Sequence, residues 1–244
     1  MNKYCVVVPH YNHVHQFEHF LPKIMAEGLS CIIADDASTA DQQKKLREIV
    51  APYENVHLVV NEENQGKGGA TKNAILKAES LGFSHCIQID ADGQHNAGDL
   101  LRFVQESEKN PGTMICGKPV FDDSIPKVRL HGRKITLYIV VLETLSLSIK
   151  DGLCGYRVYP VAQFKELLAR YSIGNRMDFD TEVLVKALWC GMQLKFIDTR
   201  VNYPEHSVSH FRYLEDNLRL IALHTRLIIG MICRLPMLIL RKFL

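Results

Sequence analysis

Short apolar runs alternate with amphipathic stretches along the first half of the chain. Four runs are apolar enough for buried strands, and a polar loop follows each of them: 4–8, 29–34, 56–60 and 85–89. The stretches between them have helical spacing, at 15–26, 41–50 and 66–81. Because strands and helices alternate with short connections, the pattern predicts an α/β domain with a mainly parallel sheet covered by helices on both faces.

The second half of the chain is less regular. We expect a strand at 113–118, followed by a polar and basic loop at 122–134 that enters a long apolar helix. The segment 151–157 is rich in turn residues between apolar neighbours. The remaining predicted elements are a helix at 99–109, a helix that starts at 178–182 and is closed by Gly191, and a last strand or pair of strands at 193–203.

Composition narrows the class of protein. With 244 residues, 47% hydrophobic and 23% charged, the chain is long enough for one large domain with a substantial core. Seven cysteines without a Cys-x-x-Cys pair indicate a reduced cytosolic interior, neither a disulfide framework nor a zinc site. No signal peptide is expected, because residues 1–3 lead directly into the first strand.

Polar residues gather where the predicted parallel strands end, at 9–12, 35–36, 64–69 and 90–92. In sheets of this kind, ligands bind at the carboxyl ends of the strands. The histidines near the first of these ends do not share one helical face and are interpreted as ordinary loop and surface residues: His10, His13, His15 and His19.

Asp90 and Asp92 stand one residue apart after the fourth strand. Adjacent strand side chains point to opposite faces, so these two carboxylates can lean to the same side and share one hard cation. Gly93 lets the backbone turn, and Gln94 and His95 add possible ligands. A divalent metal held here could stabilise a leaving diphosphate. The alternative is a turn in which both carboxylates cap backbone amides.

Two other strand ends carry residues suited to a nucleotide. Asp35 and Asp36 could bind a base edge and a ribose, or could cap the following helix, which Ser38 could do equally well. The segment 66–69 offers backbone amides and the ammonium of Lys67 to a phosphate, although its spacing is not that of a P-loop. The alternative for this segment is a plain turn from a loop into a helix.

Two further charged clusters leave their roles open. Arg129, Arg133 and Lys134 could neutralise a diphosphate or reach anionic lipid, or could form a solvated helix face. Asp180 and Glu182 lie in a first helical turn, where the helix dipole alone favours carboxylates. Alternatively, one of these two residues is a general base that deprotonates an acceptor hydroxyl.

The C-terminal segment is both basic and apolar. From residue 212 onward it carries six basic residues against two acidic ones, and three of the basic ones recur every seven residues, at Arg212, Arg219 and Arg226. Its apolar part is shorter than the ~20 residues of a membrane-spanning helix, and Arg234 and Pro236 interrupt it. We therefore expect amphipathic helices that lie in the bilayer interface. The alternative is packing on the domain or on a second subunit.

Six segments, taken in their order and spacing, resemble one known family: 8–12, 35–38, 64–70, 90–95, 151–157 and 179–182. The resemblance is to family 2 glycosyltransferases, and among them to the branch that transfers sugars to dolichyl or polyprenyl phosphate. It covers about residues 4–212. His13 stands where the family commonly has Glu, and His210 stands where a flap over the ligand usually has Lys.

The resemblance implies a GT-A fold, a UDP- or GDP-linked sugar donor and an inverting displacement. It implies Mg²⁺ or Mn²⁺ held by Asp90, Asp92 and Gln94. The residues expected to bind the donor are Pro9, Tyr11, Asp35, Asp36, Lys67, Ala91, Lys118, Arg129, Arg133 and His210. The residues expected to be catalytic are Asp151, Asp180 and Glu182. An acceptor that is a lipid phosphate needs no general base, whereas a hydroxyl acceptor needs one.

These expectations combine into one hypothesis for the chain. Residues 1–211 form the GT-A domain and 212–244 a membrane-interfacial tail, so the enzyme lies at the inner face of the cytoplasmic membrane and builds cell-envelope glycoconjugates. We expect no nucleic-acid partner. The alternatives are a haloacid-dehalogenase-like phosphatase with Asp90 as nucleophile, a sugar-phosphate nucleotidyltransferase, and a non-catalytic sugar-nucleotide-binding protein.

Overall fold

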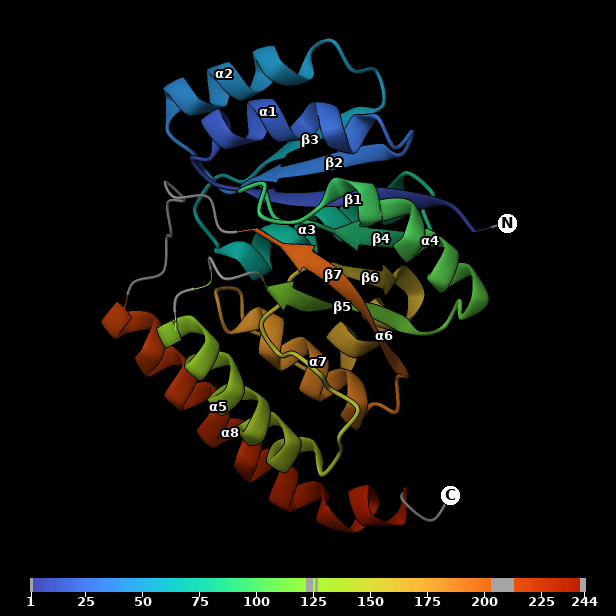
Figure 1. Ribbon diagram of the computed structural model, residues 1–244, viewed down its shortest axis with the longest axis vertical. Helices are drawn as coiled ribbons and strands as arrows, with labels where there is room; N and C mark the ends of the chain where they lie inside the picture. Colours follow the sequence, from blue (N-terminus) through green and yellow to red (C-terminus); the bar gives the residue numbers. More distant parts are fainter. Residues whose placement is uncertain (1, 122–124, 126, 203–212, 242–244) are drawn as a thin grey trace.

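A seven-stranded sheet forms the centre of the protein in the computed structural model, which describes residues 2–121, 125, 127–202 and 213–241. The strand order within this part of the chain is β3-β2-β1-β4-β6-β5-β7 (Figure 1). The strands are β1 (Tyr4–His10), β2 (Ser30–Asp35), β3 (Val56–Val60), β4 (His85–Gln88), β5 (Met114–Phe121), β6 (Arg157–Pro160) and β7 (Leu194–Val201).

Only β6 runs against the other strands of this sheet. It pairs antiparallel with β4 on one side and β5 on the other, whereas β1 pairs parallel with β2 and β4, and β7 with β5. The prediction of a mainly parallel sheet is confirmed. The sequence patterns did not predict β6, because its four residues follow a turn-rich segment and are too few for a period to be recognised.

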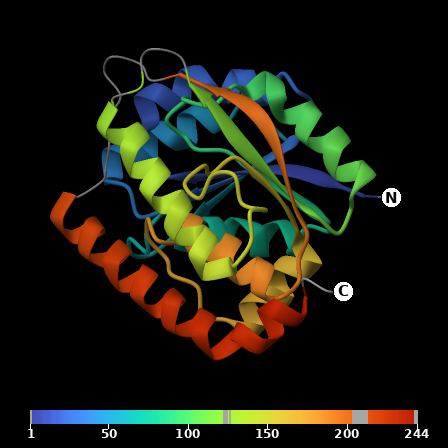
Figure 2. The same cartoon turned by 60° about the horizontal axis from the view of Figure 1, so that its bottom comes forward.

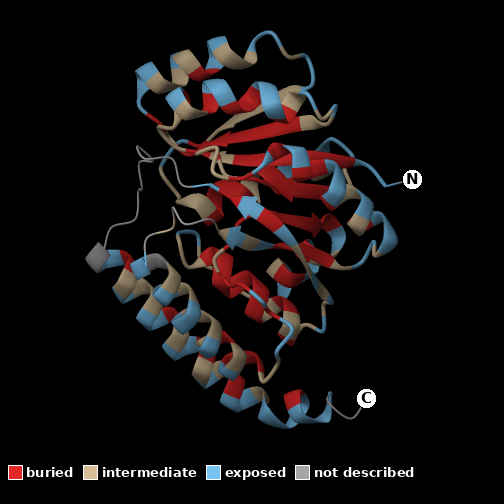
Figure 3. Cartoon of the chain, in the orientation of Figure 1, coloured by how far each residue is buried: buried red, intermediate tan, exposed pale blue. Residues whose placement is uncertain are grey.

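Helices cover both faces of the sheet (Figures 1 and 3). In chain order they are α1 (Val14–Met25), α2 (Ala40–Val50), α3 (Lys67–Ser80), the 3-10 helix η1 (Ala97–Asp99), α4 (Leu100–Lys109), α5 (Lys127–Thr144), α6 (Val161–Arg170), α7 (Phe179–Trp189) and α8 (Tyr213–Leu240). Buried residues of α1, α2 and α4 pack on one face, and those of α3, α6 and α7 on the other.

The pleat of β1 shows how one apolar run supplies both cores. Val6 and Val8 belong to the cluster under α1 and α4, whereas Cys5 and Val7 belong to the cluster under α3 and α7. Successive strand side chains point to opposite faces, so a central strand covered on both sides must be apolar at every position. This requirement explains why the run was recognisable from sequence.

Helix α5 begins earlier than predicted. The sequence analysis placed a loop at 122–134, but α5 starts at Lys127, so Arg129 and Arg133 lie in its first turns. Exposed apolar side chains recur along α5 at helical spacing: Val128, Ile135, Tyr138 and Leu142. The basic residues between these apolar positions made the helical period difficult to recognise in the sequence.

Helix α8 is one continuous helix that includes Arg234 and Pro236, the two residues that interrupt its apolar sequence. Pro236 is exposed, and so is Ile232, whose carbonyl Pro236 leaves without an intrahelical partner. Among the described helices, the span Glu215–Leu240 is long and apolar enough to cross a membrane by length and composition, and an 18-residue window within it has a mean hydropathy of 1.6. The expectation that the tail is too short for this is wrong.

One face of α8 packs on the rest of the protein. Figures 1 and 2 show α8 alongside α5, and contacts join it to α5 and α7. The residues of α8 buried in the cluster around α7 are Leu223, Leu227, Met231 and Leu238. Two polar contacts fix the helix further: Nδ1 of His224 lies 2.8 Å from Oε1 of Glu143, and the Arg234 guanidinium lies 4.6 Å from the Trp189 ring centroid.

Candidate functional site

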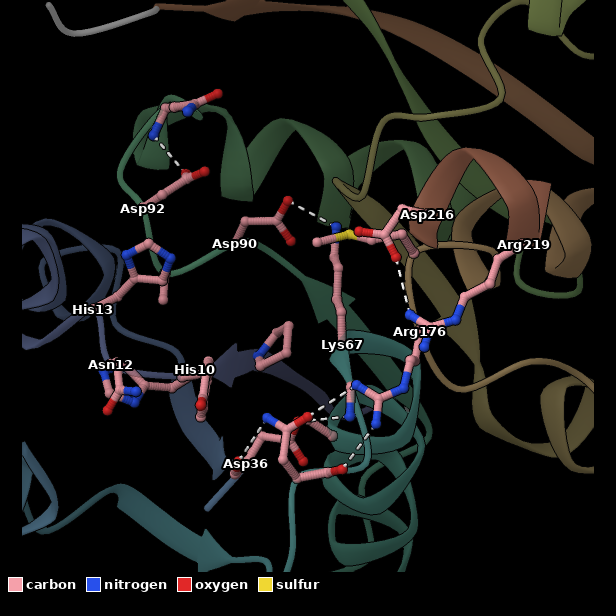
Figure 4. A pocket seen from close by; sticks show the side chains of 18 of the residues that line it. His10, Asn12, His13, Asp36, Lys67, Asp90, Asp92, Arg176, Asp216 and Arg219 are labelled. Atoms are coloured by element: carbon pink, nitrogen blue, oxygen red, sulfur yellow. Dashed lines mark hydrogen bonds and ion pairs between the residues drawn. The ribbon is translucent and has the colours of Figure 1, made fainter. Parts of the chain in front are cut away.

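A cavity of about 750 Å³ opens at the carboxyl ends of the parallel strands. Figure 4 shows His10 and Asn12 at the end of β1 on one side of this cavity, with Asp216 and Arg219 of α8 on the opposite side. Several residues predicted for the site line it: Pro9, Tyr11, Asp36, Lys67, Asp90, Ala91, Asp92, Gln94 and Arg133. Segments far apart in the chain therefore meet here, as the predicted sheet requires.

Lys67, the first residue of α3, links carboxylates from two other elements. Its Nζ donates to Oδ2 of Asp90 at 2.9 Å and to Oδ2 of Asp180 at 2.8 Å. Burial alone would lower the pKa of Lys67, but the charges of Asp180 and Asp90 outweigh burial and hold this pKa above its ordinary value. Burial would likewise raise the pKa of Asp90, but the charge of Lys67 outweighs burial and brings this pKa below its ordinary value. Lys67 is therefore an ammonium held between carboxylates.

Local packing brings Lys67 to this position. Gly68 lies so close to Phe179, the first residue of α7, that a Cβ atom on it would be 2.5 Å from the Cβ of Phe179. Gly66 has a φ of +90°, which a glycine adopts without strain. Gly68 therefore serves the close approach of α3 to α7, and Gly66 also lies close to Asn175 and Arg176 in the loop before α7.

Arg157 lies behind Asp180 and is fully buried. Its Nη1 is 3.9 Å from Oδ1 of Asp180, and within the described residues neither atom has a hydrogen-bond partner. Asp180 thus faces a cation with each of its oxygens. Sequence reasoning missed this role, because the local pattern around Arg157 cannot distinguish a buried arginine from an exposed one.

The pair Asp90 and Asp92 fits a hard divalent cation. Both line the cavity, and Oδ1 of Asp92 accepts a hydrogen bond from the backbone amide of Gln94 at 3.0 Å. In the part of the chain that the structure describes, no three His, Cys, Asp or Glu side chains group as metal ligands. Mg²⁺ is commonly bound by one or two carboxylates plus substrate phosphates and water, and Mn²⁺ also takes oxygen ligands. Two carboxylates and the Gln94 amide match that donor set.

Two histidines are buried against site carboxylates. Nδ1 of His10 lies 2.8 Å from Oδ1 of Asp35, so the interpretation of His10 as a loop or surface residue is wrong. Burial would raise the pKa of Asp35, but hydrogen bonds from His10 and Ser38 outweigh it and bring this pKa below its ordinary value. Burial lowers the pKa of His95 to about 4, so a neutral imidazole faces Asp90 with its Nε2 at 3.9 Å.

Asp36 holds the loop between β3 and α3 in place. Its carboxylate accepts hydrogen bonds from Nδ2 of Asn61 at 2.8 Å and from the amides of Gln65 and Gly66 at 2.9 Å and 2.7 Å. Asp36 also lines the cavity. Helix α2 begins after Thr39 without a side-chain cap, so the alternative reading of Asp36 as a helix cap does not apply.

Asp151 positions Arg133 at the cavity. Nη1 of Arg133 donates to both carboxylate oxygens of Asp151, at 2.8 Å and 2.6 Å. Asp151 also accepts hydrogen bonds from the amides of Leu153 and Cys154 at 2.9 Å and 2.7 Å. Arg133 lines the cavity and Asp151 stands behind it, so this pair acts on the cavity through the guanidinium.

Some predicted site residues are not among those that line the cavity. Glu182 accepts a hydrogen bond from the amide of Gly174 at 2.6 Å, which ties down the loop before α7. Lys118 pairs with Asp198 at 3.3 Å, and both side chains are more than half exposed. Two others lie outside the described residues, namely the side chain of Arg129 and all of His210.

Sequence reasoning missed one wall of the cavity. Arg176, Asp216 and Arg219 line it, and the last two come from the first turns of α8. Nη1 of Arg219 donates to Oδ1 of Asp216 at 3.0 Å. The seven-residue spacing of the arginines was a usable signal, but it was interpreted only as a membrane-facing feature.

Comparisons with known proteins agree with this geometry. The sequence profile described as glycosyl transferase family 2 matches residues 5–168. A dolichyl-phosphate beta-glucosyltransferase of Dictyostelium discoideum is 28% identical over 184 residues, which are 71% of this chain and 54% of that protein. The chain thus spans about half the length of that relative. A UDP-N-acetylglucosamine–dolichyl-phosphate N-acetylglucosaminyltransferase of Methanococcus voltae is 21% identical over 221 residues, which are 84% of this chain and 87% of that protein.

A solved structure supports the fold. Glucosyl-3-phosphoglycerate synthase from Mycobacterium tuberculosis, in complex with Mn²⁺, UDP-glucose and phosphoglyceric acid, superposes with a TM-score of 0.63 at 15% identity. The match covers 95% of this chain and 78% of that one. Because the family profile extends from β1 into α6 and the fold agrees, the protein belongs to glycosyl transferase family 2 and is a glycosyltransferase with the GT-A fold.

Proposed function

We propose that the enzyme transfers a sugar from a UDP- or GDP-linked donor to a polyprenyl phosphate in the membrane. One observation carries the proposal: the cavity that holds Asp90 and Asp92 takes its opposite wall from α8, and α8 has an exposed apolar face. Two similar proteins named for transfer to dolichyl phosphate support it. The phosphatase and nucleotidyltransferase alternatives are set aside, because the family is now known.

The donor is proposed to lie across the strand ends. The loop held by Asp36, together with Pro9 and Tyr11 at the end of β1, would take the nucleoside, and Asp90 and Asp92 would lie beside its diphosphate. Mg²⁺ or Mn²⁺ bound by the two aspartates and Gln94 would neutralise charge on the leaving diphosphate. Arg133, oriented by Asp151, lies on the same cavity and adds positive charge.

The surroundings of Asp180 favour an acceptor that is already an anion. Lys67 binds one of its oxygens and Arg157 faces the other, so the carboxylate holds a charged cluster together. A hydroxyl acceptor would need a base to take its proton, whereas a lipid phosphate would not. We therefore assign Asp180 to positioning Lys67 next to Asp90, and the lipid phosphate to direct attack on the anomeric carbon with inversion.

Helices α5 and α8 supply a surface suited to the bilayer. The outward face of α8 exposes apolar side chains at helical spacing, among them Leu218, Ile221, Ile229, Ile232 and Ile239. The apolar stripe of α5 runs on the neighbouring helix, with Tyr138 at 75% exposure. A soluble surface rarely exposes so many large apolar residues together. We therefore propose that the enzyme binds the surface of a membrane, with α8 in the interface.

Thermal unfolding with nucleotides tests the donor site. UDP or GDP with Mn²⁺ should raise the melting temperature of the protein, and Asp92→Asn should abolish the rise, because anything that binds the folded state stabilises it. The matched control is Asp198→Asn on exposed β7, which should keep the full shift. If neither nucleotide shifts the folded wild type, the donor assignment is wrong. Transfer of labelled sugar into an organic extract containing polyprenyl phosphate then tests the acceptor.

A further inference from the structure

A second, smaller pocket lies beside the donor cavity. It has a volume of about 220 Å³ and lies between the start of α7 and the N-terminal half of α8, lined by Asn175, Arg176, Asp178, Arg219, Ala222 and Arg226. Arg176 and Arg219 also line the donor cavity, so the two spaces are adjacent. We call the smaller space the arginine pocket.

Positive charge dominates the arginine pocket. Arg176 is held in place by Asn64, whose Oδ1 and backbone oxygen accept from its guanidinium at 3.1 Å and 3.4 Å. Arg219 pairs with Asp216 at 3.0 Å and with Glu215 at 3.8 Å, and its side chain is 41% exposed, so Arg176 and Arg226 carry the uncompensated charge. Arg226 has no ion-pair partner among the residues that the structure describes. Asp178, the only carboxylate among the described residues of this lining, already accepts a hydrogen bond from the amide of Arg176 at 3.1 Å.

The positive charges of the other basic residues near the cavity are more fully neutralised by carboxylate partners. Arg133 is bound by both oxygens of Asp151, and Lys118 pairs with Asp198. An incoming anion therefore meets less compensated positive charge in the arginine pocket than at Arg133. Guanidinium groups also suit phosphate in particular, because their planar fork can donate two parallel hydrogen bonds to it.

The pocket also borders the apolar face of α8. Arg226 is one helical turn from Ala222 and Ile229, and Ile229 is 58% exposed. A ligand with an anionic head and an apolar chain could thus place its head against Arg219 and Arg226 and its chain along Ile229. A lipid phosphate has these two parts, and a free nucleotide does not.

We propose that the arginine pocket binds the phosphate head of a membrane lipid next to the site of sugar transfer. The inference rests on the proposed function, because the pocket is useful only if the acceptor arrives from the membrane. The phosphate belongs either to the polyprenyl phosphate acceptor or to an anionic lipid of the bilayer. Both present the same chemistry to the three arginines.

Sedimentation with vesicles tests the pocket on the full-length protein. The vesicles are phosphatidylcholine alone, phosphatidylcholine with phosphatidylglycerol, and phosphatidylcholine with polyprenyl phosphate. Arg226→Gln should weaken binding to at least one of the phosphate-bearing additions by about five-fold, since one basic residue near an anionic membrane surface contributes about a factor of that size. Arg226→Lys should retain most of the binding. The matched control is Arg47→Gln on α2, an exposed arginine at the opposite end of the molecule (Figure 1).

The vesicle composition identifies the source of the phosphate. A loss only with polyprenyl phosphate assigns the pocket to the acceptor, and a loss with phosphatidylglycerol assigns it to bilayer lipid. Equal binding of Arg226→Gln and wild type to both mixtures overturns the proposal, and so does an equal loss in Arg47→Gln. Arg226 does not line the donor cavity, so nucleotide-induced stabilisation of Arg226→Gln should remain unchanged. If the wild type itself shows no nucleotide shift, the proposed function has failed instead.

Discussion

Nζ of Lys67 lies 2.8 Å from Oδ2 of Asp180, although 113 residues separate them in the chain. The contact joins the first residue of α3 to the first turn of α7. Because the same ammonium also binds Asp90, the carboxylate at the proposed metal site and the carboxylate of α7 share one cation. Replacing this lysine should therefore disturb both elements at once.

Lys67→Met should lower the free energy of unfolding by about 3 kcal/mol, because it removes the lysine from two largely buried carboxylates and leaves Asp180 with Arg157 alone. Urea unfolding measures this change. The control is Lys165→Met, which removes an ammonium paired with Glu79 at a surface where both side chains are at least 40% exposed. The control should cost less than about 1 kcal/mol. Equal effects of the two substitutions would contradict the assignment of Lys67 as the centre of a buried cluster.

Gly68→Ala should destabilise the contact between α3 and α7. The new methyl group would lie 2.5 Å from the Cβ of Phe179, and overpacking of this kind costs about 1–3 kcal/mol. Nucleotide binding should weaken with it, since Lys67 moves with the same helical turn. Gly132→Ala on α5 is the control: its Cβ meets nothing within 4 Å, so alanine should be neutral or stabilising. Thermal unfolding with and without nucleotide measures both effects.

The carboxylate of Asp35 should make the free energy of unfolding depend on pH in the acid range. Its pKa in the folded protein lies below the ordinary value, so it contributes stability that is complete above the unfolded pKa of about 4. That contribution is lost as the pH falls through the lower folded pKa. The difference in unfolding free energy between wild type and Asp35→Asn should therefore be largest near neutral pH and shrink below about pH 4. A difference that stays constant over this range in urea titrations would show that Asp35 is not the responsible group.

The exposed face of α8 should bind bilayers independently of charge. Ile229→Gln should reduce binding to phosphatidylcholine vesicles by about ten-fold, because a large apolar side chain no longer enters the interface. Its thermal stability should stay close to that of the wild type. Thr225→Gln on the same face is the control and should bind like the wild type, since it removes no large apolar group. Deleting α8 is a poor test, because Leu223 and Leu227 are buried in the core.

The positions of those elements and site residues that depend on a short sequence pattern were predictable from the sequence. The strands β1 to β4 and the loops after them follow from apolar runs bounded by polar ends, and parallel pairing then places Pro9, Asp36 and Asp90 at one edge of the sheet. The close spacing of Asp90 and Asp92 predicts that they bind a metal, and the structure places both at the cavity. Each of these inferences uses residues only a few positions apart.

Features that depend on long-range packing were not predictable. Arg157 faces Asp180 only because β6 inserts antiparallel between β4 and β5. The four residues of β6 are too few for a sequence pattern to predict that insertion. Likewise, Arg219 reaches the cavity only because α8 turns back against α5 and α7. The burial of His10 depends on its partner Asp35 on the neighbouring strand. In each case a polar residue takes its role from an element far away in the chain.

Helix α8 contributes to the cavity, to the core and to the exposed apolar surface, which limits how the enzyme can be engineered. Its first turns supply Asp216 and Arg219 to the cavity, its middle fills the core with Leu223 and Leu227, and its outer side remains apolar. Grafting another protein's membrane helix onto the end of α7 and β7 would therefore remove part of the chamber along with the attachment to lipid. Helix α8 is therefore not an interchangeable module, because a change to its proposed membrane-facing side also alters the wall of the cavity.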